Sequence, residues 1–91
     1  MSESAETRLK RLRMRSMRRG IKEMDLILVA FADAELADLG AAEVDLYDRL
    51  LGENDHDLYQ WVSGQVQTPA PYGPLIARIA ARANGIVKPE P

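Results

Sequence analysis

Hydrophobic residues recur along the chain at helical spacing, and no stretch alternates apolar and polar residues as a half-buried strand does. Glycine or proline, both typical of helix ends, separates the apolar stretches. The pattern predicts helices over residues 7–18, 21–39, 42–51, 54–63 and 74–84. The glycines expected to end or separate them are Gly20, Gly40, Gly52, Gly64 and Gly85. With 91 residues and short connections, the chain is predicted to be all-α: a small, single-domain five-helix bundle spanning residues 1–91.

The apolar faces of these segments predict where the core lies. The expected core residues are Leu28, Phe31, Tyr47, Leu50, Leu51, Leu58, Trp61, Ile76 and Ile79. Asn54 is predicted to cap the fourth helix, with Asp57 three residues later completing a capping box. We expect a folded core over about residues 7–84 and a mobile tail over 86–91.

Charge is divided sharply along the chain, although the net charge is only −2. Residues 8–22 contain eight basic residues and no acidic one. Residues 23–57 contain eleven acidic residues and a single Lys or Arg, which is Arg49. Four arginines at spacings of three or four line one face of the predicted first helix: Arg8, Arg11, Arg15 and Arg18. Because like charges on one face repel, we expect an acidic surface opposite them, from this chain or from a partner.

The sequence shows no pattern for catalysis or for metal binding. The absence of cysteine excludes thiolate nucleophiles, disulfides and thiolate metal sites. His56 is the only histidine, and its place in an acidic helix start favours a solvated or capping role. Ser16, Ser63 and Thr68 have no histidine beside them in sequence. We therefore predict that the protein is not an enzyme, with no catalytic residue and no metal site.

Membrane insertion and nucleic-acid binding are also disfavoured. The longest apolar run, residues 26–32, has seven residues, and a transmembrane helix needs about 20. The basic stretch could bind phosphates, but the pI of about 5.3 and the lack of interleaved aromatic residues argue against a dedicated nucleic-acid protein. A small nucleic-acid-binding or antitoxin-like regulatory module remains the alternative function.

The charge reversal falls on the run from Arg19 to Glu23. Gly20 has no side chain, so another backbone can approach closely there. Arg19 offers a fork for a carboxylate, and Glu23 can accept hydrogen bonds. If a helix continued through Gly20, Arg19 and Glu23 would project to one side. Spacing alone equally allows a helix-ending glycine flanked by a surface ion pair of little energetic value.

Two blocks of the sequence resemble one known family. The run from Arg19 to Asp25 looks like the Arg-Gly-x-x-Glu motif of the succinate dehydrogenase flavinylation (assembly) factor family. The block from Leu50 to Val62 is similar to that family's leucine pair, acidic turn and Asp-Leu-aromatic-x-Trp segment. The resemblance covers roughly residues 8–83. The chain departs from it at Gly52, so we expect the third helix to end earlier here.

The resemblance implies a fold and a function. These proteins are five-helix bundles of bacterial cytoplasm and of mitochondria. They are assembly factors that bind the flavoprotein subunit of succinate dehydrogenase, or of fumarate reductase in some bacteria, and promote covalent attachment of FAD to a histidine of that subunit. The protein would hold no cofactor stably and would act on the FAD of its client.

Site and location follow from the same resemblance. The expected partner-binding residues are Arg15, Arg18, Arg19, Gly20, Glu23 and Asp25. The expected scaffold residues are Leu50, Leu51, Leu58 and Trp61. The motif lies too near the start of the sequence to leave room for a removable leader, so we expect a bacterial cytoplasmic protein. A eukaryotic source would place it in the mitochondrial matrix, and we expect a monomer when free.

Overall fold

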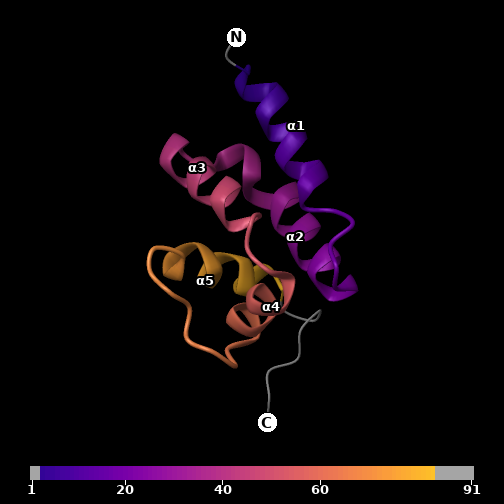
Figure 1. The fold of residues 1–91 in the computed structure, drawn as a ribbon. Coiled ribbons are helices and arrows are strands. Elements are labelled where there is room, and N and C mark those ends of the chain that lie inside the picture. The colour runs from indigo at the N-terminus through magenta and orange to yellow at the C-terminus, as the bar shows by residue number, and fades with distance from the viewer. Residues whose placement is uncertain (1–2, 84–91) are drawn as a thin grey trace.

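A computed structural model of the protein describes residues 3–83 (Figure 1). Its elements are α1 (Ala5–Arg15), α2 (Lys22–Glu35), the 3-10 helix η1 (Leu36–Asp38), α3 (Ala41–Leu50), α4 (Asp55–Ser63) and α5 (Gly73–Arg82). No residue between 3 and 83 lies in a strand, so the predicted all-α fold with five helices is confirmed. The predicted stop at Gly85 and the tail at 86–91 lie outside the described residues.

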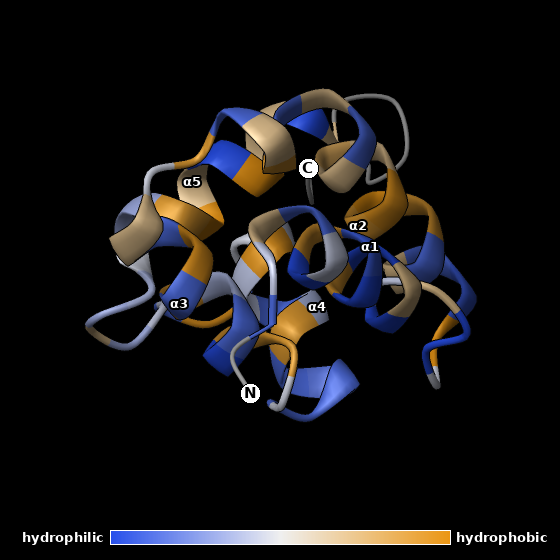
Figure 2. Ribbon diagram, turned by 90° about the horizontal axis from the view of Figure 1, so that it is seen from above, coloured by the Kyte–Doolittle hydropathy of each residue, from blue (hydrophilic) through white to orange (hydrophobic). Residues whose placement is uncertain are grey.

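Helix α2 lies at the centre, in contact with α1, η1, α4 and α5. Met24, Ile27, Leu28 and Phe31 recur along α2 at helical spacing and are fully buried. Leu50, Leu58, Ile76 and Ile79 from the later helices complete the core around them. Each such side chain contributes about 1.5–3 kcal/mol on burial. Helix α1 differs from these core helices because its residues are mainly hydrophilic (Figure 2).

The first helix ends three residues earlier than predicted. Ser4 caps its start by accepting a hydrogen bond from the Thr7 N–H at 3.1 Å. At its end the buried Ser16 hydroxyl donates to the Leu12 carbonyl at 2.8 Å and shares a 2.7 Å hydrogen bond with the Tyr47 hydroxyl. Arg18 then takes a positive φ of 54°. The chain therefore leaves the helix at Ser16, and the prediction that Gly20 ends this helix is wrong.

The other predicted boundaries lie close to the observed ones. The side chain of Asn54 accepts a hydrogen bond from the His56 N–H at 2.8 Å, as its capping role requires. The reciprocal half of the predicted capping box is absent from the described contacts, because Asp57 makes no hydrogen bond to the cap. Gly64 ends α4 with a φ of 82°, which favours glycine.

The proline-rich connection before α5 carries a core residue that the sequence pattern missed. Tyr72 is buried, its ring stacks on Trp61 at a centroid distance of 5.9 Å, and its hydroxyl donates to Glu53 at 2.8 Å. Trp61 itself is only partly buried and packs on the edge of the core. Its predicted place inside the core is therefore wrong. No helix within residues 3–83 combines the length and the apolar character that crossing a membrane requires.

Candidate functional site

The segment between α1 and α2, residues 16–21, forms what we call the motif turn. Two carboxylates hold its backbone. Asp25 accepts a hydrogen bond from the backbone N–H of Arg19. Asp55, at the start of α4, accepts from the backbone N–H of Gly20 at 2.6 Å. These bonds satisfy two consecutive backbone donors outside any helix, so the turn is held by side chains that follow it in the sequence.

Arg19 ties the same turn to the rest of the molecule. Its Nε donates to Asp55 at 2.8 Å, and its Nη1 and Nη2 donate to the carbonyls of Arg15 at 3.0 Å and Leu51 at 2.9 Å. Only 12% of its side chain is exposed. The guanidinium thus joins the end of α1, the end of α3 and the start of α4. Its charge-assisted bonds are made within the protein, so the fork expected to meet a partner faces inward.

Gly20 lies under the Asp55 carboxylate. Its residue is exposed, yet a Cβ added there would lie 3.0 Å from Oδ2 of Asp55. Such a contact is too close for any side chain unless the carboxylate shifts. The φ of Gly20 is not in the left-handed region, so a close approach, and not backbone strain, is what favours glycine here.

Arg18, within the turn, and Glu23, just after it, are exposed. None of the ion pairs formed within residues 3–83 includes either of them. The helix does not continue through Gly20, so the condition under which Arg19 and Glu23 would share a helix face is not met. Glu23 instead lies in the first turn of α2, where its negative charge interacts favourably with the helix dipole.

The arginine row on α1 meets an acidic surface of this same chain. Asp48 of α3 accepts from Arg8 at 3.2 Å, from Arg11 at 3.3 Å and from Arg15. Asp45 pairs with Arg8 at 2.7 Å. Burial would raise the pKa of Asp48, but the hydrogen bonds from Arg11 and Arg8 outweigh it and hold that pKa below its ordinary value. The acidic surface expected opposite the row is therefore internal for these three arginines. The fourth predicted member, Arg18, lies beyond the end of α1 and forms no ion pair within residues 3–83, so its place in the row is wrong.

This arrangement weakens the nucleic-acid alternative. Arg8, Arg11, Arg15 and Arg19 neutralise carboxylates of their own chain, so they are not free for phosphates. Within residues 3–83 no group of three or more histidine, aspartate or glutamate side chains is placed to hold a metal ion. What the turn offers chemically is a surface whose backbone is held by internal hydrogen bonds and which carries the exposed charge of Arg18.

The predicted site residues therefore separate into two sets. Gly20, Glu23 and Arg18 lie outward, whereas Arg15, Arg19 and Asp25 make contacts within the protein; whether either set meets a partner stays a prediction. The expected scaffold residues Leu50, Leu51 and Leu58 are buried, with Trp61 at their edge.

Sequence reasoning missed Asp55 as the residue that holds the motif turn. The signal lay in the second sequence block, whose acidic stretch includes Asp55. Asp55 contacts both Arg19 and Gly20, so the two blocks that appeared separate in the sequence meet at this carboxylate. The spacing along the chain gave no indication of these contacts, because Asp55 lies 35 positions after Gly20 and 36 positions after Arg19.

Comparison with known proteins finds relatives over most of the chain. The family model described as flavinator of succinate dehydrogenase matches residues 10–83. The chain is 42% identical over 79 residues to succinate dehydrogenase assembly factor 2-B, mitochondrial, of Drosophila mojavensis, a match that covers 85% of this chain and 50% of that protein. It is 44% identical over 69 residues to succinate dehydrogenase assembly factor 2, mitochondrial, of Mycosarcoma maydis, covering 76% of this chain and 29% of that protein.

A third relative is succinate dehydrogenase assembly factor 2, mitochondrial, of Meyerozyma guilliermondii, 43% identical over 70 residues, which cover 76% of this chain and 52% of that protein. The chain thus spans about half or less of the length of these relatives. The family match nevertheless includes the motif turn, Asp48 and Asp55. The chain therefore belongs to the family of flavinators of succinate dehydrogenase.

Proposed function

We propose that the protein is an assembly factor that binds the flavoprotein subunit of succinate dehydrogenase and promotes covalent attachment of FAD to it. The family match and the names of its relatives support this proposal. The observation that carries it is the motif turn, in which Asp25 and Asp55 fix the backbone on either side of an exposed glycine. A surface held this firmly loses little conformational entropy when a partner binds.

Each motif residue has a defined part in this proposal. Gly20 leaves room for the Asp55 carboxylate that fixes the exposed turn, and Glu23 accepts hydrogen bonds from the client. Arg19 acts from within, by holding the turn in its docking shape. The docked protein would keep a flexible part of the client in the orientation that favours attack of its histidine on the flavin, which is catalysis by positioning.

The protein itself would hold no cofactor stably, because the FAD belongs to the client. It would act without catalytic residues of its own and as a monomer when free. A fumarate reductase flavoprotein is a second client of the same chemistry. For a bacterial source we place the protein in the cytoplasm, and for a eukaryotic source in the mitochondrial matrix, since the relatives it matches are named as mitochondrial proteins.

Co-expression with the cognate flavoprotein subunit tests the proposal. Covalent flavin is measured by its fluorescence in a denaturing gel, with and without this protein. We expect a strong increase when the protein is present, and equal fluorescence in both samples would refute the function.

A glycine pair tests the turn. Gly20→Val places a side chain against Asp55, whereas Gly40→Val is the control, because a Cβ at Gly40 would lie at an ordinary 3.8 Å from Oε1 of Glu43 and its φ of −70° suits any residue. We expect the first variant to lose binding while keeping its helicity and the second to bind normally. Normal binding by Gly20→Val would show that the client docks elsewhere.

A further inference from the structure

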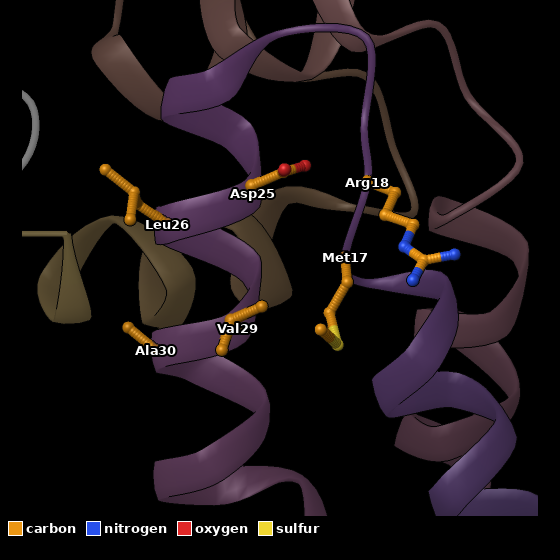
Figure 3. Close-up of a pocket in the computed structure, with 6 residues that line it drawn as sticks. All are labelled: Met17, Arg18, Asp25, Leu26, Val29 and Ala30. Atoms are coloured by element: carbon orange, nitrogen blue, oxygen red, sulfur yellow. The ribbon is translucent and has the colours of Figure 1, made fainter.

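An open apolar groove of about 480 Å³ adjoins the motif turn. Its walls are Met17, Leu26, Val29 and Ala30. Figure 3 shows Met17 and Val29 in the gap between the turn and α2, with Leu26 and Ala30 on the adjoining face of α2. The buried residues of α2, such as Leu28 and Phe31, belong to the core, so this groove uses another face of the helix.

Exposed apolar side chains are concentrated here. Among residues 3–83 the large hydrophobic side chains that remain exposed are Met14, Met17, Leu26 and Val66. Two of the four line this groove, Leu26 being 52% exposed and Met17 38% exposed. Single exposed hydrophobic residues are ordinary, but neighbouring ones that line a hollow are typical of a binding surface.

The mouth of the groove carries an exposed cation, Arg18, next to the carboxylate of Asp25. Arg18 and Asp25 line it at the end nearest the turn. Asp25 accepts a hydrogen bond from the backbone N–H of Arg19, whereas Arg18 pairs with no carboxylate among residues 3–83. Arg18 also keeps a φ of 54°, a left-handed conformation that residues other than glycine rarely adopt. The chain thus tolerates backbone strain at a cation that nothing within the described residues neutralises.

The groove and the motif turn form one continuous surface. Met17 and Arg18 belong to the turn and also line the groove, and Asp25 touches both. A stable protein interface needs roughly 800 Å² from each partner, and a six-residue turn is too small to supply that area alone. A client that covers Gly20 must extend over neighbouring surface, and the groove is the apolar surface that adjoins it.

We propose that this groove is the second half of the docking surface for the flavoprotein subunit. It receives an aliphatic side chain of that subunit, next to a carboxylate of the subunit that pairs with Arg18. The aliphatic walls and the exposed Arg18 guanidinium favour this combination. The inference rests on the proposed function, and it adds an apolar anchor to a turn whose own contacts are polar. Apolar anchors of this kind carry most of the binding energy in many interfaces.

Two matched pairs of variants test the groove. Leu26→Ser removes the apolar wall, and Val66→Ser is its control, since Val66 is 44% exposed and lies outside the groove. Arg18→Glu reverses the charge at the mouth, and Arg49→Glu is its control at another exposed arginine. Affinity for the purified flavoprotein subunit is measured by calorimetry, with thermal melts to verify folding. We expect about tenfold weaker binding for each groove variant and unchanged binding for each control.

The outcomes separate this inference from the proposed function. If Gly20→Val loses binding while Leu26→Ser and Arg18→Glu bind normally, the groove lies outside the interface and the proposed function stands. If the unmodified protein does not bind the flavoprotein, the proposed function fails. If sedimentation shows that Leu26→Ser abolishes self-association and leaves flavoprotein binding unchanged, a second copy occupies the groove and the inference is overturned.

Discussion

Helices α1 and α5 both pack against α2, but by different chemistry. Helix α5 buries Leu75, Ile76 and Ile79 in the core, in addition to surface ion pairs such as that of Arg78 with Glu35. Helix α1 fully buries only Leu12 and is otherwise held by arginines that reach the acidic side chains of α3. Apolar burial is not directional, whereas ion pairs fix position and weaken with salt.

The difference bears on the site because the motif turn joins α1 to α2. One end of the turn follows the charge-held helix, and the other begins the core helix. Asp55 and Asp25 bond across this junction. The stability of the fold therefore comes mainly from the core, whereas the shape of the turn depends on charged groups as well.

The largest expected effect is a difference in the free energy of unfolding between a variant in α5 and a variant in α1. Ile79→Ala should lower the free energy of unfolding by about 2–5 kcal/mol, because it leaves a cavity in the core. Leu9→Ala on α1, where the side chain is only partly buried, should cost about 1 kcal/mol. Urea denaturation of both variants measures the difference. Equal losses would show that α1 is as much a part of the core as α5.

A smaller effect is expected from the charge contact. Asp48→Asn removes a carboxylate charge shared by three arginines and should cost about 1 kcal/mol, a difference that shrinks as salt is raised. Asp38→Asn is the control, since Asp38 is exposed and belongs to η1. Urea denaturation at low and high sodium chloride measures the loss of unfolding free energy and its dependence on salt. A salt-independent loss would mean that Asp48 acts through packing.

The pH dependence is a milder test of the same contact. The pKa of Asp48 is held below its ordinary value of 3.8, and the hydrogen bonds from Arg82 and Arg78 likewise lower the pKa of Glu35. Their contribution to stability is complete above the unfolded-state pKa values and is lost as the pH falls through the folded-state values. We expect the free energy of unfolding to drop below about pH 5, and less steeply in Asp48→Asn than in the unmodified protein. Parallel curves for the two proteins would contradict this.

The sequence predicted the helices well because their signals are local. Asn54 and Gly64 cap the two ends of α4 and act within one turn of that helix. Most of the predicted core is buried as expected. The end of α1 was misjudged because Ser16 is held by the Tyr47 hydroxyl, a contact between distant residues. An arginine, Arg18, takes the left-handed conformation that a glycine would be expected to take.

The candidate site was predictable in part, for the same physical reason. Gly20 and Glu23 lie at the surface, where a local motif places them. The inward position of Arg19 follows from Asp55 and the carbonyl of Leu51, which only the tertiary fold brings near. From the sequence alone, a charged residue in a motif is easily assigned to a partner contact. Only the tertiary fold shows that a carboxylate of the same chain lies beside it.

The central claim is that the turn held by carboxylates forms the docking surface, and Asp55 tests it most directly. Asp55→Ala removes the acceptor for Arg19 and Gly20, whereas Asp57→Ala removes a carboxylate from the same first turn of α4 that makes no hydrogen bond within residues 3–83. The measurement is the affinity of each variant for the flavoprotein subunit. The account predicts at least about tenfold weaker binding for Asp55→Ala and normal binding for Asp57→Ala. Equal affinities for the two variants would contradict it.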